Sequence, residues 1–61
     1  MTVNDFISVS AIGNMTVHDK RLVYFFDVDH IPRCKEMFGS REIYIISALT
    51  PDHIEIILKN E

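Results

Sequence analysis

The sequence predicts a single compact α+β domain over residues 1–61, with a four-stranded, mainly antiparallel sheet and two short helices. Three observations predict this fold class. The chain has 61 residues, which is one domain at most. Apolar residues recur at helical spacing in two segments, each of which stops at one of the two glycines. Four further segments are rich in β-branched or aromatic residues and form two pairs separated by short turns. The predicted order is helix, strand, strand, helix, strand, strand.

The first helix is expected to begin at Thr2 and to stop near Gly13. The Thr2 side chain can cap the helix, and Asp5, three residues later, completes an approximate capping box. Asp5 also lies near the positive end of the helix dipole. The apolar residues that follow helical spacing are Val3, Phe6, Ile7 and Ala11. A helix this short depends on packing rather than on propensity.

A β-hairpin is expected next. Its first strand covers Asn14–His18, Asp19 and Lys20 form a tight turn, and the second strand covers Arg21–Val28. The second strand contains Leu-Val-Tyr-Phe-Phe and is apolar on both faces. A strand of this kind is expected in the middle of a sheet, or between two helices that cover it from both sides.

The second half of the chain repeats the pattern of a helix followed by a hairpin. The helix lies within Asp29–Gly39, and Pro32 is in its first turn, where its missing N–H is tolerated. The core-facing positions of this helix are Cys34, Met37 and Phe38. The third strand covers Ser40–Leu49, residues 50–52 form a turn, and the last strand covers His53–Leu58.

Composition and charge exclude several classes of function. The chain has six Lys and Arg against nine Asp and Glu, a net charge of −3, so a nucleic-acid partner is disfavoured. The single cysteine excludes an internal disulfide framework and a Cys-rich zinc module, and it favours a reducing compartment. The sequence shows no signal-peptide pattern and no apolar run long enough to cross a bilayer. We therefore expect a cytoplasmic protein without a membrane partner.

The segment Phe25–Asp29 looks like the first motif of haloacid dehalogenase phosphatases, an apolar strand that ends in Asp-x-Asp. That fold needs a much larger parallel sheet and further Lys and Asp residues, and too few residues follow Asp29. A calcium loop is excluded because Ile31 and Pro32 occupy the positions of an oxygen ligand and a glycine. We expect no catalytic residue and no enzyme, and we interpret Asp29 as a cap of the second helix.

Residues that commonly bind transition metals are few and far apart in the sequence. The candidates are His18, His30, His53 and Cys34. His30 and Cys34 are close in sequence, but a zinc site would also need a histidine from a distant strand. The interpretation that we favour is three surface histidines and a buried Cys34 thiol, because free cysteines are usually buried. We expect neither a metal nor another cofactor.

The most informative feature is a surplus of apolar residues on the predicted strands. Alternation along the strands places one group on a first face, namely Val23, Phe25, Ile43, Ile45, Ile54, Ile56 and Leu58. A second face receives Tyr24, Phe26, Tyr44, Ile46 and Ile57. Either the helices cover opposite faces, or one face meets another chain. In the latter case we expect the second face to bind a protein partner or a second copy in a homodimer.

Four pieces of the sequence carry a resemblance that covers most of the chain. They are Met1–Ile7, Val17–Lys20, Arg41–Ile43 and Ile54–Leu58. In these pieces the chain resembles small uncharacterised proteins encoded by phages and mobile elements of Firmicutes and gut bacteria. The resemblance implies a phage or prophage context, and hence the cytoplasm of a host cell, but it carries over no catalytic residue.

These observations predict a non-enzymatic, phage- or prophage-derived protein-binding module. Its most specific form is an inhibitor of a host defence system, such as an anti-CRISPR protein, by analogy with other small phage domains. The alternative function is that of a small nucleic-acid-binding regulator. The acidic net charge disfavours this alternative, because a nucleic-acid-binding protein is expected to carry a basic face.

Overall fold

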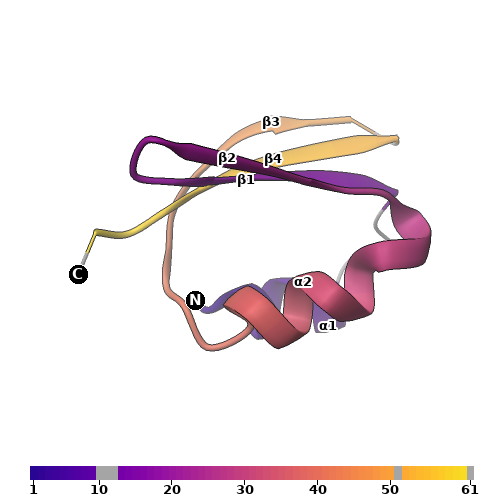
Figure 1. The fold of residues 1–61 in the computed structure, drawn as a ribbon, viewed down its shortest axis with the longest axis horizontal. Helices are drawn as coiled ribbons and strands as arrows, with labels where there is room; N and C mark the ends of the chain where they lie inside the picture. The colour runs from indigo at the N-terminus through magenta and orange to yellow at the C-terminus, as the bar shows by residue number, and fades with distance from the viewer. Residues whose placement is uncertain (10–12, 51, 61) are drawn as a thin grey trace.

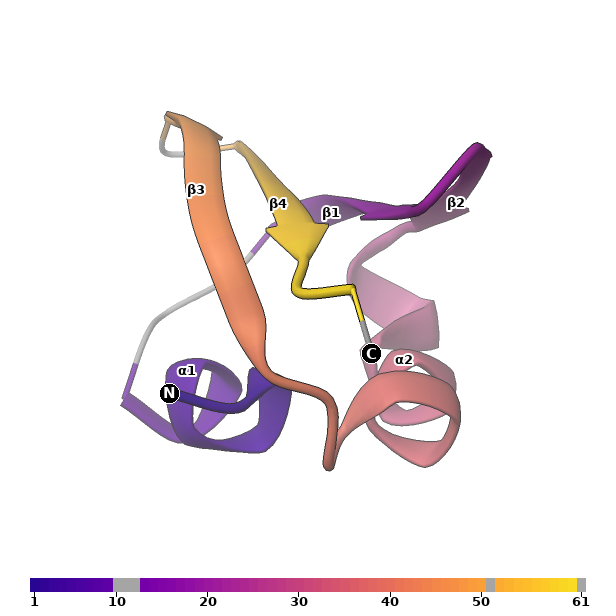
Figure 2. The same cartoon turned by 90° about the vertical axis from the view of Figure 1, so that its left-hand side faces the viewer.

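Both helices of the protein lie against the same face of a four-stranded sheet (Figures 1 and 2). The structure is a computed structural model, and it describes residues 1–9, 13–50 and 52–60. The elements are α1 (Val3–Val9), β1 (Asn14–Asp19), β2 (Leu22–Phe26), the short 3-10 helix η1 (Val28–His30), α2 (Ile31–Phe38), β3 (Ile43–Leu49) and β4 (His53–Leu58). The predicted α+β fold class and the order of its elements are confirmed.

The sheet has the strand order β2-β1-β4-β3. The two outer pairs are antiparallel hairpins, whereas the central strands β1 and β4 run parallel. The parallel pair is possible because α2 carries the chain from one edge of the sheet to the other between the two hairpins (Figure 2). The sheet is therefore mixed, with its two halves joined along the β1–β4 seam.

β2 lies at an edge of the sheet, so the prediction that it is a central strand is wrong. β2 is apolar on both faces because one face packs against the helices and the other exposes apolar side chains to solvent. Phe26 faces the helices and is 6% exposed, whereas Val23 and Phe25 face away from them and are 62% and 61% exposed. The sequence left open whether the two helices cover opposite faces of the sheet. They do not, because both lie on one face and the other face carries no helix (Figure 1).

The core lies between the sheet and the two helices. β1 and β4 contribute alternate residues, since one face of each is buried and the other is partly exposed. The buried core residues are Val3, Phe6, Met15, Val17, Phe26, Cys34, Phe38, Ile54, Ile56 and Leu58. Phe38 of α2 connects the layers, with its ring edge-on to those of Tyr24 and Phe26 at centroid distances of 5.0 and 6.1 Å.

The predicted capping box at the start of α1 is confirmed. The Thr2 backbone N–H donates to Asp5 Oδ2 at 3.1 Å, and the Asp5 backbone N–H donates to Thr2 Oγ1 at 3.2 Å. The hydrogen bond from the Thr2 backbone lowers the pKa of Asp5. Ala11, the last predicted residue of the apolar stripe, lies outside the described residues.

The first hairpin turns at Lys20 and Arg21, one residue later than predicted, because Asp19 still pairs with Leu22. Lys20 has a φ of 59°. This left-handed conformation is uncommon for a residue with a side chain. The turn therefore forms at Lys20 without the glycine that usually occupies such a position in hairpins.

Both glycines lie where another segment passes very close to them. A Cβ atom on Gly13 would lie 2.7 Å from the Asp52 carbonyl oxygen, and one on Gly39 would lie 2.7 Å from Asn4 Oδ1 and would also meet the Lys35 carbonyl. The Gly39 carbonyl accepts from the Asn4 backbone N–H at 2.9 Å, which joins α1 to the end of α2. The close approach of a second segment therefore requires a residue without a side chain at both positions.

We predict that Gly39→Ala lowers the free energy of unfolding by about 1–3 kcal/mol, because the added methyl group has no room between the α2 backbone and Asn4. Urea denaturation followed by circular dichroism measures this effect. Ser40→Ala, at the exposed neighbouring position, is the control and should change stability little. Equal stability of the Gly39→Ala variant and the wild type would contradict the close contact.

Candidate protein-binding face

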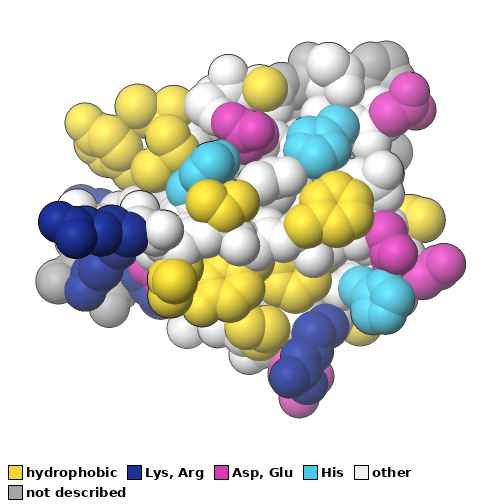
Figure 3. Space-filling model, turned by 45° about the horizontal axis from the view of Figure 1, so that its top comes forward, with side chains coloured by type: hydrophobic (Ala, Val, Ile, Leu, Met, Phe, Trp, Pro, Cys, Tyr) yellow, Lys and Arg dark blue, Asp and Glu magenta, His cyan; other side chains and the backbone are white. Residues whose placement is uncertain are grey.

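The sheet face opposite the helices is the candidate functional site, and we call it the open face. The strand register defines its residues, because partners across a ladder share a face. Its described side chains are Asn14, Thr16, His18, Val23, Phe25, Ile45, Ser47, Ala48, His53, Glu55 and Ile57. Figure 3 shows apolar, acidic and histidine side chains interspersed over this side of the molecule.

The outer strands supply the exposed apolar surface of the open face. Val23 and Phe25 of β2 lie at one side of it, and Ile45 of β3, which is 44% exposed, lies at the other. Ile57 of β4 lies between them and is half-buried. Isolated exposed apolar residues are ordinary, but here they come from both outer strands on one face, with the half-buried Ile57 between them.

Two polar clusters occupy the central strands. In the first, His53 Nε2 lies 2.8 Å from Thr16 Oγ1, and the His53 ring stacks on Phe25 at 6.0 Å with an interplanar angle of 22°. These contacts join β4, β1 and β2 across the face. They pack the imidazole against the Phe25 ring and order both side chains on the open face.

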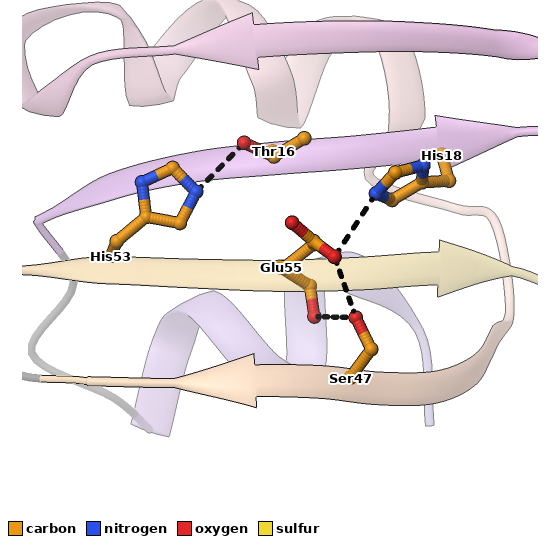
Figure 4. Close-up of polar contacts among 5 residues, drawn as sticks. All are labelled: Thr16, His18, Ser47, His53 and Glu55. Carbon is orange, nitrogen blue, oxygen red and sulfur yellow. Dashed lines mark hydrogen bonds and ion pairs between the residues drawn. The ribbon is translucent and has the colours of Figure 1, made fainter.

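In the second cluster, Glu55 lies between Ser47 and His18 (Figure 4). The Ser47 hydroxyl donates to Glu55 Oε1 at 3.0 Å, and His18 Nε2 lies 3.4 Å from the same oxygen. A serine nucleophile needs its hydroxyl bonded to the histidine that takes its proton. Here the carboxylate separates the two groups, so the contacts order side chains across β1, β4 and β3 and do not form a nucleophile–base pair.

The five residues predicted to share an interface do not share a face. Phe26 and Tyr24 pair with the buried Met15 and Val17, so they point toward the helices. Among the remaining three, Ile46 pairs with Ile56 on the helix side, Ile57 lies on the open face, and Tyr44 is exposed beside an irregularity in β3. The predicted grouping is therefore wrong, and α2 already covers Tyr24 through Phe38.

The reason for this error is the register between strands, which alternation within one strand does not give. β3 has register shifts between Ile43 and Ile45 and between Ile46 and Ala48. Each shift changes which residues share a side with β4. The polar members of the open face were not predicted as a site, although the alternation of His53 and Glu55 with apolar residues in β4 was a signal for them.

The two ends of β2 carry opposite charges. Lys20 and Arg21 precede the strand, where they line a shallow hollow together with Arg41, and Asp27 and Asp29 follow it. Arg41 also forms an ion pair with Asp19, with Nη2 3.0 Å from Oδ1. Figure 3 shows one group of basic side chains at the left, at the turn of the β1–β2 hairpin, and a second group near the lower edge of the picture.

Asp27, and not Asp29 as predicted, forms the helix cap at the end of β2. Asp27 Oδ1 accepts from the backbone N–H groups of Asp29 and His30, both at 3.1 Å, and lies 2.6 Å from His30 Nδ1. The hydrogen bond with His30 lowers the pKa of Asp27, and the same contact raises the pKa of His30. Asp27 caps η1 rather than α2 because the chain turns into the 3-10 helix directly after β2.

Cys34 is fully buried, as predicted, and its Sγ donates to Met15 Sδ at 3.7 Å. Burial raises the pKa of the thiol to about 11. Met37 was expected to face the core with Cys34, but this prediction is wrong. Met37 is 43% exposed, and the buried residues of α2 are Cys34 and Phe38. The three histidines lie on the sheet face and in η1, and within the described ranges no three His, Cys, Asp or Glu side chains gather as metal ligands would.

Comparison with models of known protein families, with curated proteins and with solved structures gave no match. In the part of the chain that the structure describes, no helix has the length and apolar character needed to cross a bilayer. Because no match was found, the function of the open face is inferred from its side chains and their contacts.

We predict that Asp27→Asn lowers the pKa of His30, because the amide keeps an acceptor oxygen for the cap but removes the negative charge beside the imidazole. An NMR titration of the His30 ring protons measures this. Asp29→Asn is the control and should lower the pKa less, since Asp29 acts on His30 only at longer range. An unchanged His30 pKa in the Asp27→Asn variant would contradict the observed pair.

We predict that Cys34 reacts very slowly with a bulky maleimide near neutral pH, because the thiol is buried and stays protonated below its pKa of about 11. Labelling followed by mass spectrometry measures the rate, and the urea-unfolded chain provides the reference for a free thiol. Rapid labelling of the native protein, at a rate close to that of the unfolded chain, would contradict the position of Cys34.

Proposed function

We propose that the protein is a non-enzymatic module that binds another protein through the open face. One observation carries this proposal: both helices cover the same side of the sheet, so Val23, Phe25 and Ile45 are exposed on the other side. Protein interfaces combine aromatic and aliphatic anchors with polar groups that form hydrogen bonds. The open face has this composition, since Phe25 and His53 lie beside the ordered cluster of Glu55, Ser47 and His18.

The charge of the open face favours a protein over a nucleic acid. Its described side chains include the carboxylate of Glu55 and no Lys or Arg. A phosphate backbone that crossed the face would meet this carboxylate without a neutralising cation. The stacked Phe25 and His53 rings are the one feature that supports the alternative, a small nucleic-acid-binding regulator, because bases stack on such rings.

The phage or prophage context implied by the sequence resemblance makes the proposal more specific. A small domain that acts inside a host cell and has one binding face can function by covering a surface of a host protein. We propose that the partner is a component of a host defence system and that the protein inhibits it, as anti-CRISPR proteins do. Self-association into a homodimer also belongs to this proposal, and the chain's small core favours it.

We predict that Phe25→Asp weakens binding to the target roughly 30-fold or more, since the loss of a large aromatic anchor typically costs about 2 kcal/mol or more. The test compares proteins captured from host lysate by the wild type, by Phe25→Asp and by the control Met37→Asp. Met37 is exposed on α2, away from the open face, so its substitution should leave capture unchanged. Circular dichroism checks that all three chains are folded.

The proposal is supported if a protein is captured by the wild type and Met37→Asp but not by Phe25→Asp, and if the purified pair then shows the same order of affinities. Equal capture by all three chains would contradict the use of the open face. Salt-sensitive recovery of RNA or DNA, lost in Phe25→Asp, would support the nucleic-acid-binding alternative instead.

A further inference from the structure

We propose that two copies of the chain associate edge to edge through β2, so that their sheets join into one continuous eight-stranded sheet. The proposal goes beyond target binding, because the second copy is bound through the backbone of the β2 edge, and the two open faces then continue into each other. The number of strands follows from the four in each copy. The occupant of the β2 edge is thus a second copy of this chain, related by a two-fold axis.

The β2 edge lacks the features that normally prevent strand pairing. Proteins protect edge strands with bulges, prolines, charged side chains or a covering segment. Leu22–Phe26 contains no charge and no proline, and its register with β1 is regular over all five residues. No hydrogen bond joins its outer side to another described residue, and α2 lies beneath the strand rather than beside it (Figure 2).

The opposite edge, β3, is protected in two ways. It has register shifts at two places, and these disturb the regular row of backbone groups that a new strand would need. Its beginning is also occupied, because the Ile43 backbone N–H donates to the Met1 carbonyl at 2.9 Å and Thr2 forms a bridge with Glu42. Of the two edges, β2 is therefore the one available for pairing.

The sequence of β2 is complementary to itself in the antiparallel direction. A two-fold axis at Tyr24 places Val23 opposite the partner's Phe25, which pairs the two side chains that are 62% and 61% exposed. The same register places Leu22 opposite the partner's Phe26. Val23 and Phe25 of one copy thus lie beside Phe25 and Val23 of the other on the joined open face, and each pair shields part of its apolar area from water.

Charge selects the same register. One residue beyond the strand at each end, Arg21 lies opposite the partner's Asp27, and the two-fold axis repeats this pair. The three contacts recorded for the Asp27 carboxylate all involve Oδ1, and an ionised carboxylate can accept hydrogen bonds at both oxygens. A second copy therefore matches the β2 edge in shape, apolar pattern and charge.

The test uses two charge-reversal variants of the full chain, Arg21→Asp and Asp27→Arg. Each variant alone brings like charges together twice per dimer, so we expect its association to be roughly tenfold or more weaker than that of the wild type. An equal mixture restores both attractive pairs, so heterodimers should form with an affinity near that of the wild type. Sedimentation equilibrium from low micromolar to millimolar concentration measures all three cases.

A second pair of variants keeps the test valid if loss of the Asp27 cap unfolds a chain. Val23→Cys and Phe25→Cys, both at exposed positions, should form a disulfide with each other under mild oxidation, because the proposed register places them directly opposite. Val23→Cys mixed with Ile45→Cys is the control, since Ile45 lies on the opposite edge strand and should not cross-link.

Heterodimer rescue in the charge-reversed mixture, or selective cross-linking of Val23→Cys with Phe25→Cys, supports the proposal. A wild-type chain that stays monomeric up to millimolar concentration would overturn it. So would a dimer that forms equally well in each charge-reversal variant alone, or cross-linking that is as fast for Ile45→Cys as for Phe25→Cys. None of these three results decides whether the open face captures a target, because target capture is measured in a separate experiment.

Discussion

The structure depends on one constraint: in the described part of this 61-residue chain, two short α-helices are available to cover a four-stranded sheet. Both helices lie on one side, where a dry core forms around Met15 and Cys34. A single core of this kind is all that a domain of this size can build. The opposite side of the sheet is consequently left to side-chain contacts between strands, and those contacts determine what the protein can bind.

The open face is ordered without a covering layer. Side-chain contacts run across the strands. Phe25 stacks on His53, which is hydrogen-bonded to Thr16, and Glu55 accepts a hydrogen bond from Ser47 and lies 3.4 Å from His18. Such contacts reduce the side-chain freedom that would otherwise be lost on binding. The face is therefore partly preorganised, as the proposed binding to another protein would require.

The sequence predicted the elements better than it predicted how they combine. The capping residues Thr2 and Asp5 and the alternation in β4 are local signals, and they specified the start of α1 and the buried face of β4 correctly. The edge position of β2 could not be predicted, because an apolar strand looks the same at an edge with one solvent face as in the centre. Likewise, no local sequence pattern predicts the register shifts in β3, and these shifts determine which residues of β3 lie on the open face.

The parallel pairing of β1 with β4 also has a kinetic consequence. Each antiparallel hairpin joins neighbouring segments, so it can form by local contacts within microseconds. The β1–β4 seam pairs Asn14 with His53 and Val17 with Ile56, residues from opposite halves of the chain, and it closes only after α2 has crossed the sheet. Loop-closure entropy makes such non-local contacts slow to form. Until this seam closes, the inner edges of β1 and β4 have no strand partner, and such unpaired edges can pair with another chain.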